Sequence, residues 1–182
     1  MRIIAGQHRG IRLAALGKGD PAAHLRPTSD RVRESLFSIL TTYVDWDGAM
    51  VLDLFAGTGA LGFESLSRGA KHVTFVDNGR SAQRLIQENT LKLKAEQATR
   101  MIAMDATRLG PAPHTCDVVF LDPPYGKNIG ASALQSAQHH GWLSETALIV
   151  WEENAPQLAP LGFVALDQRR YGDTHITLMQ VQ

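Results

Sequence analysis

The feature that most constrains the fold of this chain is an apolar run that ends in a glycine turn. Residues 51–55 read Val-Leu-Asp-Leu-Phe, and Ala-Gly-Thr-Gly-Ala-Leu-Gly follows directly. Such a run is typical of a buried parallel strand, and glycine lets the backbone turn tightly into a helix. Gly57, Gly59 and Gly62 satisfy the G-x-G-x-x-G pattern, with Asp77 20 residues after Gly57. The pattern predicts a Rossmann-like sheet that binds an adenosine-containing ligand.

Two ligand classes fit this turn. A dinucleotide would bring a pyrophosphate beside it, whereas S-adenosylmethionine would bring a cationic ammonium group. Asp53 lies four residues before Gly57. Its carboxylate would repel a pyrophosphate and attract an ammonium group. This favours S-adenosylmethionine, with a purely structural Asp53 that caps backbone amides as the alternative. Asp77 would then accept from the ribose hydroxyls. Asn78 beside it and Asp105-Ala106, which could accept from the adenine amino group, would complete the pocket, although each of these two positions could instead be an ordinary loop cap.

Short β-rich runs alternate with helical patterns after residue 50, as in a parallel sheet covered by helices. The last two strand-like runs have no helix between them, which predicts an antiparallel hairpin joined by residues 167–172. We therefore expect helices at about 60–67, 81–94 and 132–140, and strands at 51–55, 72–76, 100–104, 117–121, 147–151, 162–166 and 175–181.

A second motif, Asp122-Pro123-Pro124-Tyr125, follows the fourth expected strand. Two prolines remove two N–H donors, so backbone carbonyls and the Asp122 carboxylate can face a ligand only as acceptors. Such acceptors suit the exocyclic amine of a nucleobase, whose nitrogen becomes more nucleophilic when its N–H bonds are held. Tyr125 could stack on the base. Together with the glycine turn, the motif predicts an amino-group methyltransferase rather than a hydride-transfer enzyme.

Residues 1–45 are expected to form a basic amino-terminal extension. Glycines and a proline interrupt its first part, which predicts a hairpin or loop. Residues 27–30 offer helix caps, and the apolar positions that follow recur at helical spacing, so we expect a helix with Arg31, Arg33 and Ser35 pointing away from its apolar stripe. The first 35 residues hold more basic than acidic side chains, whereas the whole chain has 18 of each. This excess suggests an arm for a polyanion, with ordinary solvated surface, the commoner case for a short charged segment, as the alternative.

The composition fits one domain with a short appendage, since the chain has 182 residues of which 44% are hydrophobic. A single cysteine, Cys116, excludes an internal disulfide and a multi-cysteine zinc site. The adjacent His139 and His140 would point about 100° apart on a helix, so we expect no metal site. Because we find neither a signal-peptide pattern nor an apolar run of about 20 residues, we expect a cytoplasmic protein without a membrane partner. We also expect the protein to be a monomer.

The glycine turn, the Asp-Pro-Pro-Tyr motif and the amino-terminal extension together resemble the RsmD-type 16S ribosomal RNA guanine-N2 methyltransferases, which have the class I S-adenosylmethionine-dependent fold. The resemblance covers nearly the whole chain. Its family-specific part is residues 26–37, Arg-Pro-Thr-Ser-Asp-Arg-Val-Arg-Glu-Ser-Leu-Phe. One departure is that residues 19–25 are longer and less basic than expected, which leaves the position of the RNA-facing loop open. The other matching segments are 1–6, 9–10, 53–62, 67–70, 122–125 and 170–174.

The resemblance implies an α/β fold with a seven-stranded, mostly parallel sheet and a terminal antiparallel hairpin. It divides the chain into an RNA-facing extension, residues 1–45, and a methyltransferase domain, residues 46–182. The implied reaction methylates the exocyclic N2 amine of guanine 966 in 16S ribosomal RNA, on an assembling small subunit. S-adenosylmethionine would supply the methyl group and leave as S-adenosylhomocysteine, without a metal.

Matching motifs assign site residues in three groups. The guanine would be held by Asp122, Pro123, Pro124 and Tyr125. The RNA phosphates would be bound by Arg2, Arg9, Arg12, Arg26, Arg31 and Arg33. Contacts with S-adenosylmethionine would come from Asp53, Phe55, Ala56, Gly57, Thr58, Gly59, Asp77, Asn78, Asp105 and Ala106.

Two other functions remain open at this point. A DNA adenine-N6 methyltransferase is one, because Asp-Pro-Pro-Tyr distinguishes neither adenine from guanine nor DNA from RNA. Such enzymes usually carry a separate target-recognition domain, for which this chain has no room. The other is a non-catalytic RNA-binding assembly factor that keeps the fold. Asp53, Asp77 and Asp122 argue against it, since a protein without catalysis does not need all three.

Overall fold

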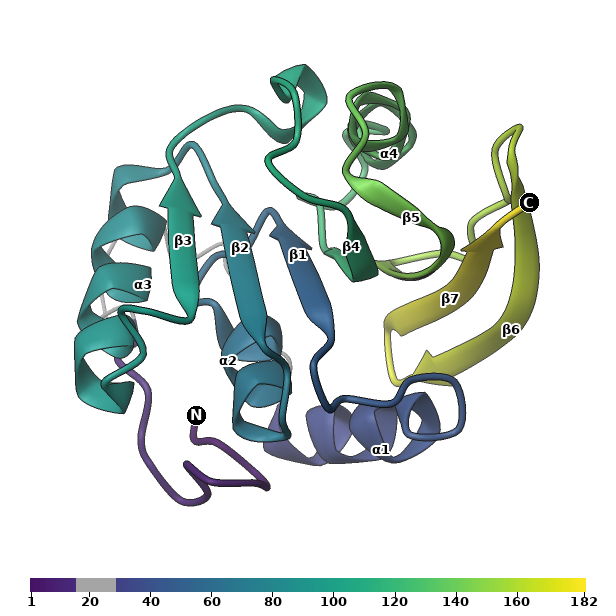
Figure 1. Cartoon of the computed structure of the whole chain (residues 1–182). Helices are drawn as coiled ribbons and strands as arrows, with labels where there is room; N and C mark the ends of the chain where they lie inside the picture. Colours follow the sequence, from purple (N-terminus) through teal and green to yellow (C-terminus); the bar gives the residue numbers. More distant parts are fainter. Residues whose placement is uncertain (16–28) are drawn as a thin grey trace.

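The computed structural model describes residues 1–15 and 29–182. Its centre is one seven-stranded sheet with the order β3-β2-β1-β4-β5-β7-β6 (Figure 1). Strands β1 to β5 are parallel, while β7 runs antiparallel to both of its neighbours. The sheet confirms the predicted fold class, including the terminal hairpin. The strands are β1 (Met50–Leu54), β2 (His72–Val76), β3 (Thr99–Ile102), β4 (Cys116–Leu121), β5 (Leu143–Glu153), β6 (Phe163–Tyr171) and β7 (Thr174–Val181).

Helices cover both faces of the sheet and bury one apolar cluster on each. Side chains of α1 (Asp30–Leu40), α2 (Ala60–Ser67) and α3 (Arg80–Leu93) share one cluster. On the other face lie α4 (Gly130–His139) and the short 3-10 helix η1 (Ala106–Arg108). Figure 1 shows α4 on the opposite side of the sheet from α1. Among the described residues, no helix is long and apolar enough to cross a membrane.

Gly62 allows α2 to pack closely on the sheet. A Cβ atom at this position would lie 2.4 Å from the ring of Phe75 and 2.7 Å from a methyl group of Val73. Both distances are shorter than any ordinary carbon contact. The third glycine of the motif is therefore required by helix–sheet packing, while Gly57 and Gly59 shape the turn itself.

The amino-terminal arm, residues 1–14, lies against α1, α2 and α3. Arg2 and Arg12 form an isolated antiparallel bridge, in keeping with the expected hairpin or loop. The buried Glu64 of α2 accepts hydrogen bonds from the backbone N–H groups of Ile4, at 2.7 Å, and Ala5, at 3.1 Å. Asn89 of α3 accepts another, at 2.6 Å, from the backbone of Ala14. Buried polar side chains thus hold the arm in place.

The domain boundary at residue 45 stays a prediction. Two expectations for local structure were wrong. Residues 167–171 belong to β6, and only Gly172 and Asp173 form the turn. Arg33 does not point away from the apolar stripe of α1 but is fully buried. The helix does begin as expected, because the Ser29 hydroxyl accepts from the Val32 N–H at 3.3 Å.

Candidate active site

The predicted site residues follow strands that end side by side at one edge of the sheet. Leu54, the last residue of β1, pairs with Val76 of β2 and with Leu121 of β4. Val76 also pairs with Ile102 of β3. The residues after these strand ends therefore share the carboxyl edge, which is where open α/β sheets bind ligands. They are the glycine turn, Asp77, Asp105 and the segment from Asp122 to Tyr125.

The glycine turn is tied to the end of β2 by Asp77. One carboxylate oxygen accepts from the Gly57 N–H at 2.9 Å, and the other accepts from the Gly79 N–H at 2.8 Å. Each oxygen can accept a further bond, which would suit a ribose hydroxyl. Phe55 enters the turn with φ 59°, a strained conformation for a residue with a side chain, and such strain is common at ligand-binding sites.

Asp53 is buried beneath the turn, and one of its carboxyl oxygens accepts from the Gly62 N–H at 3.0 Å. This is the contact expected of a structural cap; its role toward a ligand stays a prediction. Burial raises the pKa of Asp53 to about 8, the hydrogen bond from Gly62 opposes the shift, and Asp77 adds repulsion. A cation placed near Asp53 would favour the carboxylate form.

Asp105 caps the short helix η1. Its Oδ1 atom accepts from the N–H of Thr107 at 2.9 Å and from its hydroxyl at 2.8 Å, and these bonds lower the pKa of Asp105. Ala106 is buried and Asn78 is exposed. The loop-cap alternative is therefore realised for Asp105, while the adenine contact stays a prediction.

Asp122 is half-buried directly after β4, and its N–H donates to the carbonyl of Leu54 at 3.4 Å. Burial raises its pKa well above the ordinary value, and repulsion from Glu152, Asp53 and Glu153 raises it further. Such a carboxyl group is a better proton acceptor than an exposed one, and it would be stabilised as a carboxylate by any positive charge brought beside it.

Tyr125 presents an aromatic ring at the same edge, with 40% of the residue exposed. Its hydroxyl donates to Glu152 Oε1 at 3.3 Å and lies 3.4 Å from the Thr174 hydroxyl. Burial is the main cause that raises the pKa of Tyr125 to about 12. The phenol therefore stays protonated and fixes the ring, whose exposed part is available for stacking.

Sequence reasoning missed Glu152 and Glu153, which are both buried at the end of β5. Trp151 of β5 pairs with Leu121, the last residue of β4. The residues that follow them, Glu152 and Asp122, are therefore at the same level along the two neighbouring strands. Two acidic residues directly after an apolar run, Trp-Glu-Glu-Asn, were the available signal. Within residues 1–15 and 29–182, no three His, Cys, Asp or Glu side chains are grouped as they would be around a metal ion.

The predicted phosphate-binding arginines separate into two kinds. Arg2, Arg9, Arg12 and Arg31 are exposed, whereas Arg26 lies outside the described residues. Arg33 is buried, and its guanidinium donates to the Arg2 carbonyl and to Asp30 Oδ1 at 3.0 Å. Its side chain is used inside the protein to join α1 to the arm, which removes it from the surface that RNA can reach.

Asp53 makes protein stability depend on pH in a defined direction. Because folding raises its pKa from 3.8 to about 8, the folded state keeps a proton that the unfolded state loses. The stability contributed is complete below about pH 4 and is lost as the pH rises through about 8. Asp53→Asn keeps an acceptor for Gly62 but cannot ionise. We therefore expect its free energy of unfolding to rise, relative to that of the unmodified protein, between about pH 5 and about pH 8.

Urea unfolding at these two pH values measures the difference. Asp45→Asn, which changes an exposed loop carboxylate, controls for the loss of one carboxyl group. If the free energies of unfolding of the unmodified protein and of Asp53→Asn differed by the same amount at both pH values, the raised pKa of Asp53 would be contradicted.

Known proteins match this chain along nearly its whole length. A family model described as "Conserved hypothetical protein 95" matches residues 1–180. The "Ribosomal RNA small subunit methyltransferase D" of Haemophilus influenzae is 37% identical over 186 residues, which cover 99% of this chain and 93% of that protein. The Escherichia coli protein of the same name is 37% identical over 163 residues, which cover 88% of this chain and 78% of that protein.

The solved structure of YhhF of Escherichia coli has the same architecture. It superposes with a TM-score of 0.84 at 33% identity, and the match covers 100% of this chain and 98% of that one. The similarity therefore includes both the amino-terminal arm and the sheet edge that carries the candidate site.

Proposed function

The chain belongs to the RsmD family of methyltransferases, and from this we propose that it methylates the exocyclic N2 amine of guanine 966 in 16S ribosomal RNA. S-adenosylmethionine is the methyl donor, and the substrate is an assembling small ribosomal subunit in the cytoplasm. The observation that carries the proposal is the position of Asp122-Pro123-Pro124-Tyr125 after β4, directly beside the glycine turn after β1.

The residues at the sheet edge fit S-adenosylmethionine, which supplies a methyl group bound to a cationic sulfur. The backbone from Phe55 to Gly59, with Ala56, Gly57 and Thr58 between them, would lie along the ligand. Asp77 would accept from the ribose hydroxyls, with Asn78 beside it, and Asp105 and Ala106 would hold the adenine. The buried Asp53 and the half-buried Asp122 repel each other, and a positively charged ligand would relieve that repulsion. The proposal includes no metal.

Asp122 and its neighbouring carbonyls hold the target amine. Pro123 and Pro124 offer no N–H groups, so the amine meets only acceptors and both of its N–H bonds can be held. The nitrogen lone pair is then directed at the methyl group. As the N–C bond forms and the C–S bond breaks, the amine becomes cationic, and the Asp122 carboxylate stabilises this charge and can accept the proton.

Tyr125 and the arginines position the RNA. The Tyr125 ring, fixed through Glu152 and Thr174, would stack on the guanine. Exposed Arg2, Arg9, Arg12 and Arg31 would neutralise phosphates, and Arg26 stays in this predicted set. Arg33 is left out because it is buried.

A methyl-transfer assay with three substrates tests the proposed function. The protein is incubated with methyl-labelled S-adenosylmethionine and unmodified small ribosomal subunits, bare 16S RNA or duplex DNA. We expect label in the RNA of the subunits. Label in duplex DNA alone would favour a DNA methyltransferase, and RNA binding without label in any substrate would favour a non-catalytic assembly factor.

A further inference from the structure

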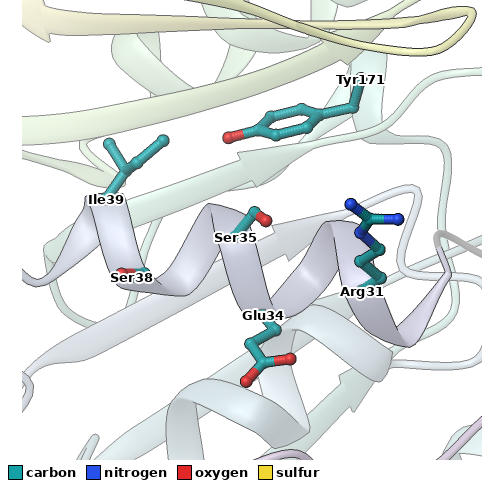
Figure 2. A pocket seen from close by; sticks show the side chains of 6 residues that line it. All are labelled: Arg31, Glu34, Ser35, Ser38, Ile39 and Tyr171. Atoms are coloured by element: carbon teal, nitrogen blue, oxygen red, sulfur yellow. The ribbon is translucent and has the colours of Figure 1, made fainter.

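A groove separates α1 from the end of β6 at the protein surface. Its volume is about 530 Å³, within the range of pockets that hold a small organic ligand. Figure 2 shows that Tyr171 extends over α1 and forms one wall. The lining residues are Arg31, Glu34, Ser35, Ser38, Ile39 and Tyr171.

We call this groove the α1–β6 groove. Its floor is a row of charged, polar and apolar side chains along α1. Arg31, Ser35 and Ile39 are spaced four residues apart and so lie on one side of the helix. Figure 2 shows all three directed to the Tyr171 side, whereas the Glu34 carboxylate points away from the ring. A guanidinium, a hydroxyl and an aliphatic side chain therefore follow one another beneath an aromatic ring.

The groove is close to the residues that hold the target base. Tyr171 and Thr174 are paired across the terminal hairpin, and paired residues project from the same face of a sheet. The Thr174 hydroxyl in turn lies 3.4 Å from the Tyr125 hydroxyl. An RNA chain whose methylated base rests on Tyr125 therefore has a neighbouring nucleotide within reach of Tyr171.

We propose that the α1–β6 groove binds a nucleotide adjacent to the methylated guanosine, with its base stacked on Tyr171 and its phosphate bound by Arg31. Stacking on an aromatic ring and binding of phosphate by a guanidinium are the two interactions by which proteins hold single-stranded RNA. This inference rests on the proposed function and adds a second contact with the substrate. It assigns Tyr171 and Arg31 to substrate affinity and register rather than to the chemical step.

Steady-state kinetics with small ribosomal subunits tests the groove. Tyr171→Leu keeps apolar contact with the core but removes the aromatic face, and we expect it to raise KM about tenfold with kcat nearly unchanged. Tyr171→Phe should restore KM. Ser35→Phe, which fills the groove from α1, should raise KM while leaving Tyr171 in place. The affinity for S-adenosylmethionine should stay unchanged in all three variants.

The proposed contact between Arg31 and a phosphate is tested by the salt dependence of RNA binding. Arg31→Gln should reduce the slope of log affinity against log salt by about one. Arg84→Gln removes the same charge from the exposed surface of α3 and serves as the matched control, with an unchanged KM.

Two outcomes would overturn this assignment, and they can be told apart. If the unmodified protein methylates the subunits but Tyr171→Leu and Ser35→Phe leave KM unchanged, the groove does not bind the substrate and the proposed function stands. If the unmodified protein does not methylate ribosomal RNA, both the proposed function and this inference fail.

Discussion

Replacing Asp122 by alanine is expected to lower kcat by roughly 10²–10⁴-fold, the usual contribution of a side chain that accepts a proton in the reaction. In the proposed reaction the carboxylate would hold the amine and stabilise its developing charge, so the loss should fall on the chemical step. The affinity for S-adenosylmethionine should change by less than about twofold, since most of the proposed contacts with this ligand lie after β1, β2 and β3. Single-turnover methylation and calorimetric titration measure the two quantities separately.

Asp122→Asn separates charge from shape at the same position. Its amide keeps one acceptor, but its NH₂ group opposes an N–H of the substrate, so we expect a loss of kcat close to that of the alanine variant. If Asp122→Ala lost affinity for S-adenosylmethionine and kept its kcat when saturated, Asp122 would belong to the methyl-donor site and the proposed chemistry would be wrong.

Replacing Glu64 by alanine is expected to have the largest effect on stability. Glu64 is fully buried, accepts from the backbone of Ile4 and Ala5, and forms an ion pair with Arg68 at 2.9 Å. Its removal leaves two backbone donors and a partly buried guanidinium without their acceptor. Breaking a buried ion pair from one side typically costs about 3–5 kcal/mol, and we expect a loss of this size in the free energy of unfolding.

Glu88→Ala is the matched control. Glu88 is also paired with a basic residue four positions later, Lys92 at 2.9 Å, but both side chains are largely exposed. Exposed pairs of this kind contribute about 0.2–1 kcal/mol. Urea unfolding compares the two variants, and trypsin cleavage at Arg2, Arg9 and Arg12 reports whether the arm detaches before the domain unfolds. If Glu64→Ala and Glu88→Ala lost the same free energy of unfolding, and trypsin did not cleave the arm of Glu64→Ala, the anchoring role of Glu64 would be contradicted.

The sequence was sufficient for the fold, and for grouping the candidate site residues at one edge of the sheet, because the decisive signals are local. A short apolar run followed by Gly57 and Gly59 specifies a strand, a turn and a helix, and β2 and α2 begin and end where expected. Parallel strands bring their carboxyl ends to one edge. Motifs after strands such as Asp77 and Asp122 could therefore be placed together without knowledge of the structure.

The errors and omissions have their cause in contacts between distant segments. Arg33 looks like a surface arginine in its helix, but the arm, about 30 residues earlier, covers it through the Arg2 carbonyl. Glu152 carries no motif and reaches Asp122 only through the register of β4 with β5. The α1–β6 groove joins two segments from opposite ends of the chain, which no local pattern could predict.

Identification of the methylated nucleoside tests the central claim most directly. Small ribosomal subunits are methylated with labelled S-adenosylmethionine, and their RNA is digested and analysed by mass spectrometry, with the position mapped by primer extension. The account predicts N2-methylguanosine at position 966 with the unmodified protein, formed far more slowly with Asp122→Ala. N6-methyladenosine as the labelled product would leave the fold and the role of the Asp-Pro-Pro-Tyr segment intact, but it would contradict the guanine-N2 assignment.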